Sequence, residues 1–279
     1  DGSLNRSIQK TVSSLSELPL LLKLMSVCPL TDHKMEAVLT EIRSNLLFSI
    51  SEHLHSPEVL RFQSALALQC FTNEYVYTKT IDEVEAAHSL ENLVKMSLSR
   101  GQQPSPKFVL CLASYKALQE YDWCDLLTDL NSFKEVFTRQ VIEPRQEGDL
   151  KSSIPALQKI EDKVSSKVRE QYEKNPYPRW VNLRLPLKPS PIAKVVDQLN
   201  LKLFDFGINK IVNPNILIAG CGTGQHSIGT AATFIGSKVL AIDLSLSSLA
   251  YAKRKTHELS IQNIEYMQAD ILDLGKLDR

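Results

Sequence analysis

The sequence predicts an all-α helical domain followed by the first half of a Rossmann-like sheet, with about three parallel strands. Two observations divide the 279 residues in this way. Residues 1–150 contain several helix starts and no strand-like alternation. Residues 206–279 contain three short apolar runs separated by helical stretches, and each run ends in a glycine loop or a carboxylate, as in parallel βαβ units. The predicted fold class is therefore α plus α/β.

Helix starts recur through residues 1–150, which we predict to form one all-α domain. Two serines precede a proline at the first helical position, and two Ser/Thr-x-x-Glu patterns fit the capping box. These starts are Ser56-Pro57, Ser105-Pro106, Thr80 with Glu83, and Ser132 with Glu135. The spacing of the two Ser-Pro starts is consistent with stacked pairs of helices. The sequence does not, however, contain a recognisable tetratricopeptide pattern.

Residues 151–205 are predicted to connect the two domains. The polar stretch at residues 145–149 is predicted to interrupt the helical structure ahead of this connection. A helical segment is then expected from about Ile154 to Tyr172. Two prolines within residues 175–178 then prevent helix and favour extended backbone.

The clearest chemical signal is the segment Ile216 to Gly224, which reads ILIAGCGTG. It is an apolar strand that runs into three alternating glycines and then into a helix-compatible stretch, residues 225–235. Glycine tolerates positive φ and lets a ligand approach the main chain. The backbone N–H groups that start the helix would then face that ligand. We call residues 220–224 the glycine loop and predict that it binds a cofactor through Gly220, Cys221, Gly222 and Gly224.

Carboxylates follow the next two predicted strands. Residues 238–242 end at Asp243, about twenty positions after the loop, where a βαβ nucleotide fold places the acid that accepts from ribose hydroxyls. Residues 264–268 end just before Asp270. Because the carboxyl ends of parallel strands share one edge of the sheet, we expect the loop and both acids to lie together.

The glycine spacing separates the candidate cofactors. A dinucleotide fingerprint reads G-x-G-x-x-G, whereas here the third glycine, Gly224, comes one place early and Gln225 stands in its position. This disfavours an NAD(P)-dependent oxidoreductase, which we keep as a third hypothesis. The second is a non-catalytic helical interaction protein with a degenerate Rossmann-like half.

The glycine spacing, Asp243 and the Ala269-Asp270-Ile271 strand end together resemble the class I S-adenosylmethionine-dependent methyltransferases. The resemblance implies methyl transfer from the sulfonium of S-adenosyl-L-methionine to an acceptor, either a protein or a small molecule. It further implies that the glycines line the methionine and sugar and that Asp243 holds the ribose. Leu244 and Ile271 would flank the adenine, and Asp270 would accept from its exocyclic amine. Ile218 departs from the family, since many members carry Asp or Glu there to seat the methionine amino group.

The same resemblance bears on the extent of the chain. A class I methyltransferase sheet has seven strands, and this sequence supplies the first three. We therefore expect residues 206–279 to be the N-terminal half of a catalytic domain, inactive on its own. The catalytic residues would lie on strands that this sequence lacks.

The region from about Asn73 to Trp180 is similar to bacterial methyltransferases that carry tetratricopeptide repeats ahead of the catalytic domain. This similarity implies that Tyr172, Tyr177, Arg179 and Trp180 form a lid over the cofactor, with Arg179 meeting the methionine carboxylate. The alternative is a packed interdomain linker in which Trp180 is a core residue. The helical domain could then present a protein or peptide substrate, cap the cleft or mediate dimers.

The amino-acid composition restricts the kinds of partner that we expect the protein to bind. The 32 basic and 32 acidic residues give no net charge, so no strong field would attract nucleic acid or an anionic membrane. No apolar stretch is long enough for a bilayer. The five cysteines form no Cys-x-x-Cys pair, which predicts reduced thiols in a cytoplasmic protein without a metal site. The oligomeric state is not predicted.

Overall fold

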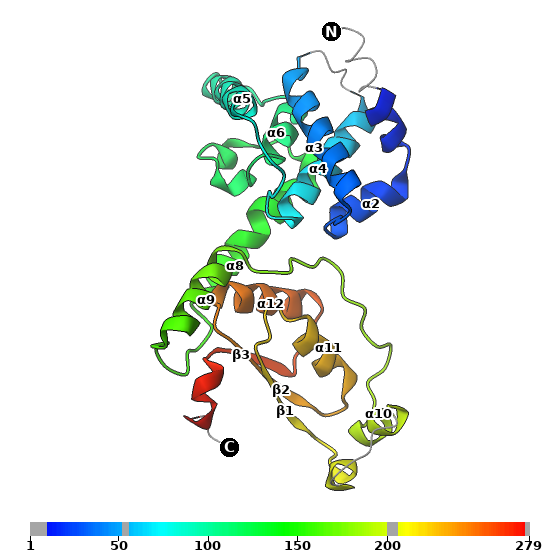
Figure 1. Ribbon diagram of the computed structural model, residues 1–279, viewed down its shortest axis with the longest axis vertical. Coiled ribbons are helices and arrows are strands. Elements are labelled where there is room, and N and C mark those ends of the chain that lie inside the picture. The colour runs from blue at the N-terminus through cyan, green and yellow to red at the C-terminus, as the bar shows by residue number, and fades with distance from the viewer. Residues whose placement is uncertain (1–9, 52–55, 200–205, 277–279) are drawn as a thin grey trace. The chain divides into compact units, whose positions relative to one another are not determined.

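The computed structural model describes residues 10–51, 56–199 and 206–276. Its elements are traced in Figure 1. The chain divides into two compact units, Asp1–Pro144 and Arg145–Arg279, which we call the helical unit and the α/β unit. The boundary predicted between residues 205 and 206 adjoins residues 200–205, which lie outside the described residues.

The helical unit contains no strand among its described residues. Pairs of helices, such as α2 with α4 and α4 with α6, pack around two clusters of buried apolar side chains. Its helices are α2 (Pro19–Val27), α3 (His33–Phe48), α4 (Pro57–Thr72), α5 (Ile81–Ser99), α6 (Pro106–Ala113) and α7 (Lys134–Phe137), with the short turns η1 (Leu118–Glu120), η2 (Cys124–Leu126), η3 (Asn131–Phe133) and the π-helical η4 (Thr138–Ile142).

Three of the four predicted helix starts are found, at Ser56, Thr80 and Ser105. The Ser56 hydroxyl accepts from the N–H of Val59 at 3.2 Å, and Thr80 and Glu83 complete a capping box. Ser105 precedes α6, but its hydroxyl makes no capping bond. The capping box predicted at Ser132 is wrong, because this residue lies inside η3 and α7 starts only at Lys134.

The predicted break at residues 145–149 is also wrong, since these residues belong to the helix α8 (Glu143–Lys151). Its polar sequence lacks an apolar period, but tertiary contacts hold it. The buried Glu147 carboxylate pairs with Arg254 at 2.9 Å, and Leu150 packs against an apolar cluster of the α/β unit. The helix expected from Ile154 begins later, as α9 (Lys163–Lys174).

The α/β unit contains three parallel strands in the order β1-β2-β3, as predicted. Helices alternate with the strands, which is consistent with a partial Rossmann-like fold. The elements after α9 are α10 (Ile192–Gln198), η5 (Phe206–Lys210), β1 (Asn215–Ala219), α11 (Gln225–Thr233), β2 (Lys238–Asp243), α12 (Leu246–Glu258), β3 (Ile264–Gln268) and η6 (Ile271–Lys276).

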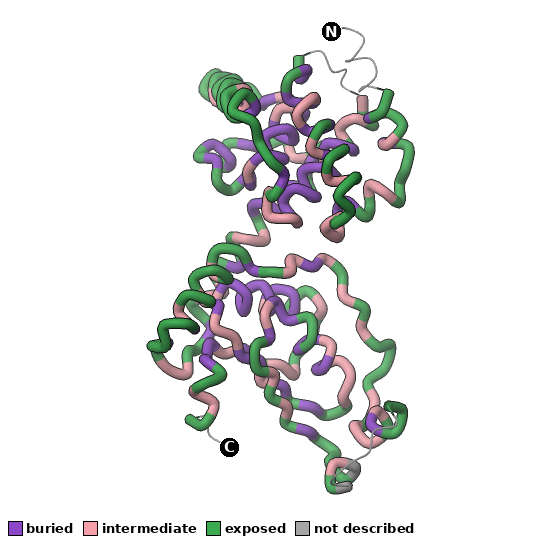
Figure 2. The backbone as a smooth tube through the Cα atoms, in the orientation of Figure 1, coloured by how far each residue is buried: buried purple, intermediate pink, exposed green. Residues whose placement is uncertain are grey.

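The two faces of this sheet differ in burial. Ile218, Ala241 and Tyr266 are neighbours in the register and pack against buried α12 side chains such as Leu249. On the opposite face Leu217 is 44% exposed. Figure 2 shows the buried backbone concentrated along α12 and the strands behind it. The apolar core of this unit therefore lies between the sheet and its helices.

The two edges of the sheet also differ. Residues 155–157 run parallel to the end of β3, with a bridge between Ala156 and Gln268. The Leu157 N–H donates to the Gln268 carbonyl at 2.9 Å, and the Gln268 N–H donates to the Pro155 carbonyl at 2.8 Å. On the other side of β1 the described residues provide no strand partner.

Candidate functional site

The glycine loop and Asp243 meet at the carboxyl edge of the sheet. The loop follows β1, and Asp243 is the last residue of β2. The N–H of Gly222 donates to the Asp243 carboxylate at 2.8 Å, and the N–H groups of Gly220 and Cys221 both donate to the Ile242 carbonyl. Residues that sequence spacing alone proposed as neighbours are thus bonded to one another.

The three glycines of the loop have different surroundings. All three have positive φ, at +74° for Gly220, +52° for Gly222 and +88° for Gly224. A Cβ added at Gly220 or Gly222 would meet nothing within 4 Å. At Gly224 the added Cβ would lie 2.6 Å from the Cβ of Ala252 on α12. The first two glycines thus leave open space, whereas the third lets α12 approach the loop.

The N-terminus of α11 carries open hydrogen-bond donors. Its N-cap is Gly224, which has no side chain to cap the first turn. In the part of the chain that the structure describes, the N–H groups of Gln225, His226 and Ser227 find no acceptor. Such donors, together with the positive end of the helix dipole, favour an anionic group at this position.

The Asp243 carboxylate is half-buried and joins two backbone segments. One oxygen accepts from Gly222, and the other accepts from the N–H of Ser245 at 3.0 Å. Because each carboxylate oxygen accepts more than one hydrogen bond, both can still receive donors such as ribose hydroxyls.

The residues predicted to surround an adenine lie in two different environments. Asp270 is 2% exposed, and its carboxylate accepts from the N–H of Leu272 at 3.0 Å. Ile271 is 57% exposed at the start of η6. Leu244 is half-buried, and its carbonyl accepts from the Gln268 side chain at 2.8 Å. The side chains of Leu244 and Ile271 are therefore at least partly accessible.

Cys221 in the glycine loop has a buried thiol. Its side chain is buried among apolar residues of the α/β unit. Burial raises the pKa of the Cys221 thiol far above its ordinary range, and the nearby Asp243 carboxylate raises it further. Since the thiolate is the reactive form, this environment disfavours reaction of the thiol at neutral pH.

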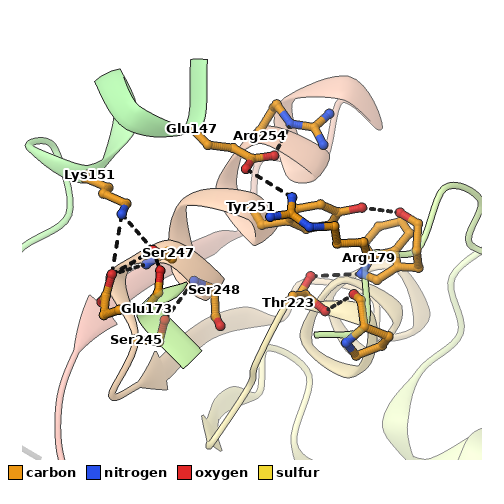
Figure 3. A network of polar contacts seen from close by, with 12 residues as sticks. Glu147, Lys151, Glu173, Arg179, Thr223, Ser245, Ser247, Ser248, Tyr251 and Arg254 are labelled. Carbon is orange, nitrogen blue, oxygen red and sulfur yellow. Dashed lines mark hydrogen bonds and ion pairs between the residues drawn. The ribbon is translucent and has the colours of Figure 1, made fainter. Parts of the chain in front are cut away.

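Trp180, predicted as a lid residue, is buried and contacts the glycine loop directly. Its indole N–H donates to the carbonyl of Thr223 at 3.0 Å, and the Thr223 hydroxyl donates to the Pro178 carbonyl at 2.9 Å. The indole also packs edge-on against Tyr251, with ring centroids 6.1 Å apart. Figure 3 shows Thr223 and Tyr251 converging on this segment. Trp180 is thus a core residue of the α/β unit that also contacts the loop.

The other three predicted lid residues do not join Trp180. One nitrogen of Arg179 lies 3.9 Å from the Glu147 carboxylate, which also pairs with Arg254. Arg179 is therefore engaged with the Glu147 carboxylate. The Tyr172 and Tyr177 side chains are 39% and 58% exposed.

Sequence reasoning missed a second carboxylate near Asp243. Glu173 on α9 accepts from the N–H groups of Leu246 and Ser247, the first two residues of α12, and from the Ser247 hydroxyl. The Lys151 ammonium donates to both Glu173 and Ser247 (Figure 3). No local signal could have found this contact, because Glu173 precedes α12 by more than seventy residues.

Comparison with known families adds one decisive finding. Residues 216–279 match the family model of a methyltransferase domain. The match begins inside β1 and includes the glycine loop, Asp243 and Asp270, and it supports a class I S-adenosylmethionine-dependent methyltransferase domain. No curated protein and no solved structure matches the chain.

Three further features of the described residues bear on function. A hollow of about 890 Å³ lies against the amino-terminal halves of the strands, between residues such as Asn215, Lys238 and Asn263, and Leu274 and Gly275 of η6 also line it. No group of His, Cys, Asp or Glu among the described residues is arranged to hold a metal ion. None of the described helices combines the length and apolar character needed to cross a bilayer.

Proposed function

We propose that the chain binds S-adenosyl-L-methionine at the glycine loop and serves methyl transfer from its sulfonium to an acceptor. The observation that carries the proposal is the uncapped N-terminus of α11, which lies beside two glycines with open space and next to Asp243. A ligand with a carboxylate at one end and a ribose at the other suits these groups, and the match to a methyltransferase domain supports this choice.

Different residues of the chain would contact the methionine, ribose and adenine parts of this cofactor. The methionine carboxylate would accept from the N–H groups at the start of α11, and the ribose hydroxyls would donate to Asp243. Leu244 and Ile271 would contact the adenine, whose amine would donate to Asp270. Each charge-assisted hydrogen bond of this kind contributes about 1.5–3 kcal/mol.

The bound cofactor would supply an electrophilic methyl group. An acceptor lone pair would form the new bond to this carbon as the carbon–sulfur bond broke, and the sulfur would keep the bonding electrons in S-adenosylhomocysteine. The described residues contribute orientation at the cofactor end, which is a large part of catalysis for an acceptor that is already nucleophilic. We assign no catalytic acid or base.

Further proposals concern the helical unit, the location of the protein and the aromatic residues before β1. The helical unit presents a protein or peptide acceptor, and the protein works in the cytoplasm. The exposed Tyr172 and Tyr177 act as a mobile cover of the cofactor. For Arg179 to bind the methionine carboxylate, it would first have to leave Glu147.

Calorimetric titration of the 279-residue chain with S-adenosylmethionine, S-adenosylhomocysteine and NAD tests the main proposal. We expect the first two to bind, and Asp243→Ala to weaken them at least about 100-fold, because the ribose and the Gly222 N–H both lose their acceptor. Asp273→Ala, which removes an acid on η6, is the matched control and should leave affinity unchanged.

Two other outcomes would favour the competing functions. Saturable binding of NAD alone would overturn the proposal in favour of an oxidoreductase. Binding of none of the three ligands would favour a non-catalytic interaction protein.

A further inference from the structure

Residues 178–181 are fastened to the glycine loop and to α12 by a dense set of contacts. Besides the two bonds to Thr223, the Tyr251 hydroxyl donates to the Trp180 carbonyl, and the Lys255 ammonium donates to the Val181 carbonyl at 2.9 Å. The same ammonium lies 4.9 Å from the Trp180 ring centroid. A segment preceding β1 is therefore tied to elements that follow both β1 and β2.

The Thr223–Gly224 peptide is the part of the loop that Trp180 controls. Its carbonyl accepts from the indole N–H, while its own N–H, on Gly224, donates to the Cys221 carbonyl at 3.0 Å. This peptide directly precedes the uncapped first turn of α11. Its plane therefore helps to set how the glycine loop enters α11.

Glycine on one side makes this peptide easy to reorient. Gly224 has a φ of +88°, and glycine populates positive and negative φ about equally. Steric contacts within the loop therefore restrict the orientation of the Thr223–Gly224 peptide only weakly. Thr223 is 2% exposed, so water cannot replace a lost donor to its carbonyl, and an unpaired buried carbonyl is costly. The indole N–H holds the carbonyl end of this peptide, while the bond from Gly224 to the Cys221 carbonyl holds its N–H end.

We propose that Trp180 is a positioning residue for the cofactor, acting through the Thr223 carbonyl to hold the glycine loop in its binding conformation. The inference rests on the proposed function of the loop. It assigns a role to a residue outside the segment that matches the methyltransferase domain, since that match starts at residue 216. Part of the cofactor site is thus held by the chain that precedes the recognised domain.

The test compares Trp180→Phe with Leu185→Ala. Phenylalanine keeps an aromatic ring in the apolar cluster and removes the indole N–H. Leu185 packs against the same cluster of Trp180, Ile228 and Tyr251 and makes no contact with the loop carbonyl, so its truncation controls for lost stability. Two quantities are measured for each variant: the affinity for S-adenosylhomocysteine, and the hydrogen exchange of the peptide covering residues 221–228 without ligand.

We expect Trp180→Phe to weaken binding about tenfold and to speed exchange in residues 221–228 at least about tenfold, in line with one lost hydrogen bond. Leu185→Ala should change the affinity and the exchange rate by less than about twofold each. This should hold even if Leu185→Ala lowers the melting temperature as much as Trp180→Phe does. Equal effects of the two variants, or unchanged exchange in Trp180→Phe, would overturn the inference. If the wild-type chain binds no S-adenosylhomocysteine, the proposed cofactor falls, and exchange alone then decides whether Trp180 holds the loop.

Discussion

The helices α11 and α12 start at the same edge of the same sheet, yet their N-termini are treated in opposite ways. At α12 the Ser245 hydroxyl accepts from Ser248, and Glu173 accepts from Leu246 and Ser247. At α11 the cap is Gly224, and the first-turn N–H groups find no acceptor among the described residues. The protein therefore fills one anion-binding helix end with its own carboxylate and leaves the other open, where we propose that the ligand binds. Sheet topology alone cannot distinguish the two, whereas the neighbouring side chains do.

We expect the largest loss of ligand affinity from a substitution that blocks the open N-terminus of α11. Gly220→Val would place a branched side chain in the open space beside α11, at a φ of +74° that valine rarely adopts. We expect S-adenosylhomocysteine affinity to fall at least about 1,000-fold, or about 4 kcal/mol, in calorimetric titration.

Gly229→Ala is the matched control, because this glycine lies within α11 and an added Cβ meets nothing within 4 Å. It should leave the affinity unchanged and raise stability by about 0.5–1 kcal/mol. If Gly220→Val still bound the ligand with wild-type affinity, the cofactor would have to sit elsewhere.

A smaller effect is expected from separating the two helices. Gly224→Ala would bring its Cβ within 2.6 Å of the Ala252 Cβ and would strain a backbone at φ +88°. We expect a loss of about 2–3 kcal/mol in the free energy of unfolding, measured by denaturant titration. Adding Ala252→Gly should restore about half of this loss, and no recovery in the double variant would show that packing against α12 is not the cause.

We expect the smallest effect from removing the carboxylate that caps the N-terminus of α12. Glu173→Ala removes the acceptor for two N–H groups of α12, and we expect the free energy of unfolding to fall by about 1–2 kcal/mol. Glu170→Ala, an exposed acid on the same helix, should change it by less than about 0.5 kcal/mol. Affinity for S-adenosylhomocysteine should stay within about twofold, and a tenfold loss would mean that both helix ends serve the ligand.

Local sequence patterns predicted the elements that build the candidate site. The apolar runs at residues 216–219, 238–242 and 264–268 became β1, β2 and β3 almost residue for residue. The alternating glycines took the positive φ values that the loop requires. These features depend on side chains within a few positions of one another, which is the range that periodicity and turn chemistry cover.

The contacts that distinguish the two helix ends were not predictable in this way. Glu173 reaches α12, Trp180 reaches Thr223, and Glu147 reaches Arg254 across long stretches of sequence. Each pairing depends on how α8, α9 and the following segment pack, and a polar residue gives no local sign of a distant partner. The same reason made residues 145–149 look like a break, since the ion pair that holds α8 involves a residue of α12.

The bridge between Ala156 and Gln268 has a consequence for where a further strand can join the sheet. Exposed strand edges recruit further strands, and here residues 155–157 already occupy the backbone groups at the end of β3. Among the described residues, no segment pairs with the outer edge of β1. A further strand, from the same chain or from another, would therefore find its full length of free backbone groups beside β1.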